Sequence, residues 1–89
     1  MFLHIGNGKS VKKKDIIGIF DLDTATMSKA GKNFINKMQN EGKVEYDDFD
    51  LPRSFVLADF EKDKKIYLSR ISTQGLKLRF KENYDIKTD

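Results

Sequence analysis

A run of three consecutive lysines is the feature of this sequence with the clearest chemical use. Lys12, Lys13 and Lys14 come just before an apolar stretch rich in β-branched residues, where a strand would hold their ammonium groups in place. Arg53 also precedes an apolar stretch, so the four cations would converge if the two strands began at neighbouring places. Cationic side chains that contact phosphates release counterions from a nucleic acid and so drive binding. These residues therefore predict a phosphate-binding surface.

The sequence Gly8-Lys9-Ser10 resembles the end of a P-loop, whose backbone N–H groups hold the phosphates of a nucleotide. That motif needs a glycine five residues before its Gly-Lys pair, and Leu3 stands there. It also needs a helix to begin at the loop, whereas the lysine run leads into a strand. We therefore expect no ATP site and no nucleotide cofactor.

Other side chains that could bind a metal or perform catalysis lack the partners that this chemistry needs. His4 is the only histidine and the chain has no cysteine, so a zinc site has no second nitrogen or sulfur ligand. No nucleophile or acid is placed to work with this imidazole, and a structural role is favoured. Asp47, Asp48 and Asp50 lack the glycine and distal glutamate of a calcium loop. We therefore expect no metal and no enzymatic activity.

Charge is distributed unevenly along the chain, although the net charge is only +3. Residues 1–43 carry eight lysines and four acidic residues, and residues 44–63 carry two basic and seven acidic residues. Residues 64–89 carry seven basic and three acidic residues. An acidic middle between two basic ends suits an anionic partner, or head-to-tail contact between copies of the chain. A mixed, solvated surface is the simpler interpretation of composition alone.

Four short stretches rich in β-branched or aromatic residues have the pattern of strands. The strongest of them contains Gly18, which predicts a bulge or the close approach of another backbone. A turn is expected at Gly6-Asn7-Gly8, whose residues tolerate positive φ, and a charged turn is expected between the last two strands. The four predicted strands are Phe2–Ile5, Asp15–Phe20, Ser54–Phe60 and Ile66–Ser69.

Apolar residues recur every three or four positions between residues 27 and 38, which predicts one amphipathic helix. Asp23, Thr24, Thr26 or Ser28 could cap its start, and Gly42 could end it. Its core-facing side would comprise Met27, Ala30, Gly31, Phe34, Ile35 and Met38.

The stretch that begins at residue 73 fits two kinds of secondary structure. Leu76 and Phe80 have the i, i+4 spacing of a helix, which Ser72 or Thr73 could cap. Leu78 completes an alternation between the same two residues that is typical of a strand. We prefer the helix, and the strand remains open on these observations.

Together these elements predict an α+β fold, with a small antiparallel sheet packed by one amphipathic helix plus a short C-terminal helix. Residues 1–81 would form a single domain and residues 82–89 a polar tail. Residues 44–52 would be an acidic connection, because Pro52 excludes a central strand there. The chain lacks a long apolar segment and the pattern of a signal peptide, which predicts a cytoplasmic protein without membrane contact.

Several of these stretches together resemble the RemA/RemB family, extracellular matrix regulators of Gram-positive bacteria, whose RemB branch was formerly a family of unknown function. The similarity runs from residue 1 to about residue 80 and is closer to the RemB branch. Its specific part is the run KDIIGIFD at residues 14–21, and the remaining matches are weaker one by one. Those matches are Leu3–Gly6, Pro52–Leu57, Ile66–Ser69, Ser72 and Leu76–Arg79.

The resemblance implies a DNA-binding activator of matrix and biofilm genes, with a LytTR-like α+β fold and assembly into a ring of protomers. In the RemA branch, an arginine at the start of the second strand and an arginine pair before the third contact DNA. Asp15 stands at the first place, beside Lys14, and Leu51-Pro52 stands at the second, followed by Arg53. Basic charge therefore remains nearby, but the RemA-type contacts do not carry over residue by residue.

Two functions are consistent with these observations. In the first, a multimer binds the phosphate backbone of DNA, and DNA shape supplies much of the specificity. In the second, the chain assembles, or partners a RemA-type paralogue, without binding DNA, and its acidic stretch docks on a basic surface. The DNA-binding residues of the first would be Lys12, Lys13, Lys14 and Arg53, assisted by Lys29 and Lys32. The docking residues of the second would be Glu45, Asp47, Asp48 and Asp50.

Overall fold

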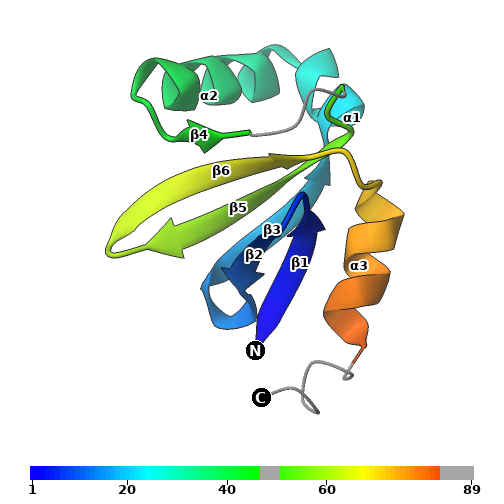
Figure 1. Cartoon of the computed structure of the whole chain (residues 1–89). Helices are drawn as coiled ribbons and strands as arrows, with labels where there is room; N and C mark the ends of the chain where they lie inside the picture. The colour runs from blue at the N-terminus through cyan, green and yellow to red at the C-terminus, as the bar shows by residue number, and fades with distance from the viewer. Residues whose placement is uncertain (47–50, 83–89) are drawn as a thin grey trace.

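A four-stranded sheet lies at the centre of the computed structural model, which describes residues 1–46 and 51–82 (Figure 1). Its strands are β3 (Ile16–Asp21), β4 (Val44–Glu45), β5 (Ser54–Phe60) and β6 (Asp63–Ser69). The strand order is β3-β5-β6-β4, so β5 and β6 are central while β3 and β4 form the edges. β3 and β6 run antiparallel to β5, whereas β4 runs parallel to β6.

A two-stranded hairpin precedes this sheet. β1 (Phe2–Gly6) pairs with β2 (Lys9–Lys12), and Asn7 and Gly8 make the turn with positive φ angles of 52° and 74°. Such angles suit two-residue hairpin turns, because their twist matches that of the flanking strands. The predicted turn is thus confirmed. One turn of 3₁₀-helix, η1 (Lys13–Asp15), joins the hairpin to β3.

Two helices follow β3 in place of the single helix that the spacing predicts. α1 (Leu22–Met27) ends at Ser28, whose backbone is extended and whose Oγ accepts a hydrogen bond from the N–H of Gly31 at 3.0 Å. This cap begins α2 (Lys29–Asn40). Met27 is therefore separated from the apolar side of α2 and is 84% exposed, so its assignment to the core is wrong.

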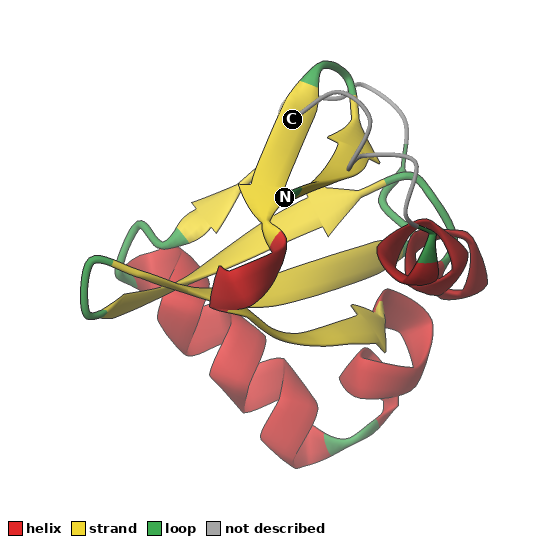
Figure 2. Cartoon of the chain, turned by 90° about the horizontal axis from the view of Figure 1, so that it is seen from below, coloured by secondary structure: helices red, strands yellow, loops and turns green. Residues whose placement is uncertain are grey.

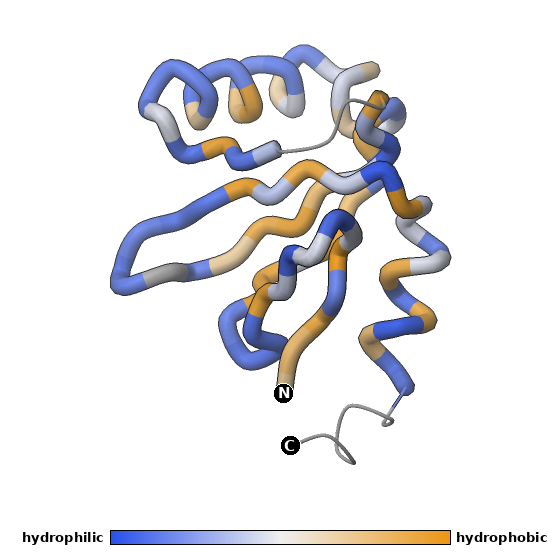
Figure 3. Tube along the Cα trace, viewed as in Figure 1, coloured by the Kyte–Doolittle hydropathy of each residue, from blue (hydrophilic) through white to orange (hydrophobic). Residues whose placement is uncertain are grey.

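The apolar side of α2 is narrower than predicted. Met38 is buried and Ile35 packs beside it, and hydrophobic residues recur on the side of α2 that faces the sheet (Figure 3). Ala30 and Phe34 are exposed, so the assignment of these two residues to the core is also wrong. Gly42, with a φ angle of 71°, ends the helix as predicted.

The C-terminal element α3 (Thr73–Lys81) is a helix, which confirms the preferred prediction. The Oγ of Ser72 caps it by accepting a hydrogen bond from the N–H of Gly75 at 3.1 Å. Leu76 is fully buried while Leu78 is 62% exposed. This difference fits a helix, because an alternating strand would place both leucines on the same face. α3 runs along the same side of the sheet as the hairpin (Figure 1).

Both faces of the central sheet are covered, because successive residues of β5 point to two different cores. Val56 and Ala58 pack with apolar residues of β1, β2 and α3. Phe55 packs on the opposite face with Met38 of α2. Figure 2 shows the hairpin and α2 on opposite sides of the sheet. A strand buried on both faces needs apolar residues throughout, which explains the unbroken apolar run at residues 55–58.

The short strand β4 lies where the sequence predicted only an acidic connection. Val44 pairs with Ile66, and the N–H of Ile66 donates to the carbonyl oxygen of Lys43 at 2.8 Å. The prediction of a connection is therefore wrong for Val44 and Glu45, which form an additional strand of the sheet. The pairing is parallel because α2 carries the chain back across the sheet before β4 begins.

The bulge predicted at Gly18 is confirmed, since the pairing of β3 with β5 shifts between Ile16 and Gly18. The ring of Phe20 covers this glycine, and a Cβ atom there would lie 2.6 Å from two atoms of the ring. Phe20 also stacks on Phe55, with ring centres 5.1 Å apart. Glycine therefore provides the space in which the Phe20 ring lies against the strand.

Two buried serines attach the hairpin and the start of α3 to the sheet. Ser69 donates from Oγ to the carbonyl oxygen of Ile5 at 2.7 Å, and accepts from the N–H of Ile71 at 3.0 Å. Ser54, its partner across β5 and β6, donates to the carbonyl oxygen of Ile71 at 2.7 Å. Both side chains are at most 2% exposed. These bonds explain why hydroxyls occupy two buried positions of the sheet.

The fold belongs to the α+β class, as predicted, with two sheets and one parallel strand pair. The LytTR likeness remains a prediction. Among the described residues, the helices are too short or too polar to cross a membrane. Glu82 is the only residue of the predicted tail that the structure describes.

Candidate nucleic-acid interface

The lysine run lies at the corner where the hairpin turns into the central sheet. Lys12 is the last residue of β2, and Lys13 and Lys14 belong to η1. The N–H of Lys13 donates to the carbonyl oxygen of Met1 at 3.0 Å, which holds this corner against the start of β1. Lys12 and Lys14 are exposed, while Lys13 is half-buried. The structure therefore keeps these three predicted residues together on one short turn.

The C-terminal end of α3 meets this corner. The Nζ of Lys13 donates to the carbonyl oxygen of Glu82 at 3.1 Å. The same nitrogen lies 5.6 Å from the ring centre of Phe80, a cation–π distance. Residues that are far apart in the sequence thus meet at the lower end of the molecule as drawn in Figure 1.

α3 also contributes two lysines that the sequence interpretation missed. Lys77 and Lys81 line a groove of about 240 Å³ between α3 and β3. The sequence could have indicated this pair, because residues spaced i, i+4 in a helix place their side chains on the same side of that helix. We use the name lysine surface for the set Lys12, Lys13, Lys14, Lys77 and Lys81.

Arg53 does not join the lysine surface within one protomer. β3 and β5 are antiparallel, so Ile16 at the start of β3 pairs with Ala58, while Asp21 at its end pairs with Ser54. Arg53, just before β5, is therefore separated from the lysine run by the length of β3, roughly 17 Å at about 3.4 Å per residue. The condition for convergence, neighbouring strand starts, is not met.

Arg53 instead lies beside the beginning of α1. Its carbonyl oxygen accepts a hydrogen bond from the N–H of Leu22 at 3.0 Å. The carboxylate of Asp21 caps α1 and has a lowered pKa, because it accepts hydrogen bonds from the backbone and hydroxyl of Thr24 and lies near the charge of Arg53. The guanidinium is therefore close to an acidic group, which reduces the positive potential there.

Lys29 and Lys32 are on the first turns of α2, which begins next to α1 (Figure 1). They lie toward the end of the sheet where Arg53 is found, away from η1. The six predicted residues thus divide into two groups at opposite ends of the sheet. Only the lysine run belongs to the larger lysine surface.

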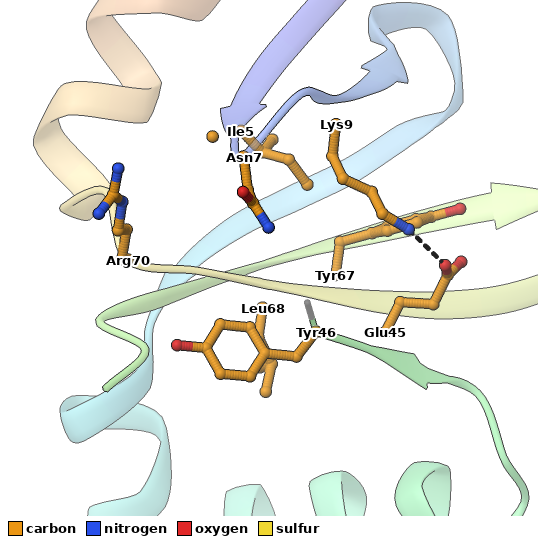
Figure 4. Close-up of a pocket in the computed structure, with 9 residues that line it drawn as sticks. Ile5, Asn7, Lys9, Glu45, Tyr46, Tyr67, Leu68 and Arg70 are labelled. Atoms are coloured by element: carbon orange, nitrogen blue, oxygen red, sulfur yellow. Dashed lines mark hydrogen bonds and ion pairs between the residues drawn. The ribbon is translucent and has the colours of Figure 1, made fainter. Parts of the chain in front are cut away.

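The acidic stretch is represented in the described residues by Glu45. Its carboxylate binds the Nζ of Lys9 at 2.9 Å and the Nζ of Lys65 at 3.0 Å (Figure 4 shows the first of these bonds). Hydrogen bonds from these two lysines lower the pKa of Glu45. Glu45 therefore ties the hairpin to the sheet edge. The other residues proposed for docking lie outside the described residues: Asp47, Asp48 and Asp50.

The cavity beside Glu45 is too small for an organic ligand. It measures about 20 Å³, which is room for about one water molecule. Tyr67, Tyr46 and Arg70 are among the residues that surround it (Figure 4). Burial and the nearby Glu45 raise the pKa of Tyr67. This site therefore suits a structural junction between the hairpin and the sheet.

The remaining candidate groups take part in hairpin contacts. His4 Nδ1 lies 2.8 Å from the Oγ of Ser10 on the exposed face of the hairpin. Lys9, in the sequence that resembles a P-loop end, lies on β2 and binds Glu45, and a strand follows it. Within residues 1–46 and 51–82, no group of three acidic or histidine side chains is placed to hold a metal ion.

One comparison with known proteins supports the resemblance to the RemA/RemB family, without distinguishing its RemA and RemB branches. No curated protein matches the chain. A family model described as RemA-like, extracellular matrix regulatory protein A-like, matches residues 2–80. This span includes the hairpin, the central sheet and all but the last residue of α3. The chain therefore belongs to the RemA-like family of extracellular matrix regulatory protein A-like proteins.

Proposed function

We propose that this protein regulates extracellular matrix genes by binding DNA in the cytoplasm as a multimer. Family membership supports the regulatory role. The lysine surface is the observation that carries DNA binding, because the end of β2, η1 and α3 contribute its five lysines from two distant parts of the chain. Such a surface suits phosphates, which a duplex presents along its whole length.

The small number of cations on each protomer is the reason for proposing that the protein binds DNA as a multimer. Five phosphate contacts give weak, salt-sensitive binding, whereas a multimer that presents the surface repeatedly binds through avidity. The edge strand β3 offers a place for contact between copies, because Ile17 is 49% exposed and Phe20 is 42% exposed along it. Exposed apolar edge strands favour pairing with other chains.

The proposal is tested by removing two lysines whose side chains are exposed, Lys12 and Lys14. Lys12→Ala/Lys14→Ala should weaken binding to any duplex and reduce the slope of log K against log salt by about 1.8, at roughly 0.9 per phosphate contact. Lys13 is left in place because its Nζ also holds Glu82. Fluorescence anisotropy with a labelled duplex at several salt concentrations measures both quantities.

A matched control comes from two exposed lysines elsewhere. Lys32→Ala/Lys37→Ala removes the same charge from α2, which lies on the opposite side of the sheet from the hairpin. This control should change the salt slope much less. Equal slopes for wild type and the Lys12/Lys14 variant would refute the assigned surface.

A second function, an assembling protein-interaction module without DNA binding, is favoured by the exposed edge of β3. In this case the partner is another copy or a RemA-type paralogue. A large assembly that has no affinity for duplex DNA at low salt would support this module over the regulator. Neither function involves a catalytic site.

A further inference from the structure

Two partly exposed aromatic rings lie among the cations of the lysine surface. Phe2 is 42% exposed and Phe80 is 39% exposed. Phe2 stands directly opposite Lys12 in the hairpin, so both side chains project from the same exposed face. The Nζ of Lys13 lies 5.6 Å from the ring centre of Phe80. Each ring therefore has one residue of the lysine run as a neighbour.

The two rings line two separate grooves, and Lys13 of η1 is close to both. Phe2 contributes, with Met1 and the lysine run, to a groove of about 510 Å³. Phe80 contributes to the groove of about 240 Å³ that Lys77 and Lys81 flank. Lys13 lines the first groove, and its Nζ lies near the Phe80 ring that lines the second, so this lysine is close to both grooves.

Phosphate binding alone does not need aromatic rings. In a duplex the bases are stacked inside, and a protein surface that follows the backbone meets phosphates and sugars. An unpaired strand exposes base faces beside each phosphate, and proteins that bind such strands combine a basic groove with aromatic platforms. The arrangement of Phe2 and Phe80 among five lysines has this combination.

We infer that the lysine surface binds single-stranded DNA, with bases stacked on Phe2 and Phe80 and phosphates on the surrounding lysines. The inference rests on the proposed nucleic-acid binding and adds a strand preference to it. Unpaired DNA is bound more tightly than duplex DNA of equal length at this surface. The rings supply affinity that does not depend on salt, and the lysines supply the part that does.

The test compares three labelled ligands by fluorescence anisotropy: oligo(dT), a duplex of the same length, and an abasic strand with the same phosphates. Phe2→Leu/Phe80→Leu keeps apolar side chains but removes both flat rings. Its affinity for oligo(dT) should fall about 30-fold or more, since stacking on each of the two rings contributes at least ~1 kcal/mol per base. Its affinity for duplex and abasic strands, and its salt slope, should remain as in wild type.

Two controls separate stacking from a folding defect. Phe34→Leu changes a ring of similar exposure, 36%, on α2 at the opposite side of the sheet, and should leave oligo(dT) affinity unchanged. Phe2→Tyr/Phe80→Tyr keeps both ring faces and should bind oligo(dT) as wild type does. Urea unfolding of each variant verifies that the fold is retained.

Each other outcome overturns the inference in a distinguishable way. If wild type binds duplex DNA but oligo(dT) no more tightly than the abasic strand, the stacking inference fails and the proposed function stands. The same conclusion follows if the leucine variant retains full oligo(dT) affinity. If no oligonucleotide binds, the proposed function fails as well. Binding to phosphatidylserine vesicles without oligonucleotide binding would show that the lysines and rings form a membrane-binding surface.

Discussion

Ser69 provides a sharp test of how the fold holds the hairpin that carries the lysine run. Its side chain is 2% exposed, and its Oγ bonds both the carbonyl oxygen of Ile5 and the N–H of Ile71. Ser69→Ala would leave these two groups without their partner. An unsatisfied buried polar group costs about 1–3 kcal/mol. Because Ile71 is half-buried and water can reach part of it, we expect a combined loss of about 2–3 kcal/mol in the free energy of unfolding.

This loss is large for so small a protein. At roughly 0.05–0.15 kcal/mol per residue, a chain of 89 residues has about 4–13 kcal/mol of stability. The expected loss corresponds to a Tm lowered by about 8–24 °C, at about 4–8 °C per kcal/mol. Urea unfolding followed by circular dichroism measures the change in free energy directly.

Ser10→Ala is the matched control, because Ser10 is exposed and its hydroxyl forms a hydrogen bond with His4 across the hairpin. It should change stability by less than about 0.5 kcal/mol. If Ser69→Ala cost no more than Ser10→Ala, the idea that Ser69 attaches the hairpin to the sheet would be refuted.

Two further predictions concern the sheet edges. Since ion pairs with Lys9 and Lys65 lower the pKa of Glu45 below its ordinary value of 4.5, their stabilisation is present above that value and is lost as the pH falls through the lowered pKa. Glu45→Gln should therefore flatten the acid side of the curve of urea midpoint against pH, and an unchanged curve would contradict this. Ile17→Glu, on the exposed edge of β3, should reduce the assembly mass measured by light scattering, whereas Leu78→Glu should not. Equal masses for wild type and Ile17→Glu would exclude this edge as the contact.

Much of the fold was predictable because local patterns and tertiary packing agree. The β-branched run around Gly18 forms a strand with a bulge, and the spacing of Leu76 gives a helix. Met27 was misplaced because helical spacing continues unchanged across Ser28, where the helix breaks. Val44 was missed because a two-residue strand depends on a parallel partner that the local sequence does not reveal.

The candidate site was predictable only in part, for a similar reason. Consecutive lysines at 12–14 stay together in any fold, so their clustering could be predicted. Whether Arg53 joins them depends on the relative direction of β3 and β5, which is a property of topology. Phe80 reaches Lys13 from the far end of the chain through the packing of α3, with Lys77 and Lys81 along the groove beside its ring, and the sequence alone gives no direct sign of this contact.

The most direct test of the central claim is a titration of purified protein onto fluorescent duplex DNA at several salt concentrations, with the mass recorded by light scattering. We predict an assembly several times heavier than the 10.3 kDa chain. We also predict a salt slope steeper than about −4.5, the value for five phosphate contacts from one lysine surface at roughly 0.9 each. An assembly without affinity for DNA even at low salt would contradict the account and favour a protein partner.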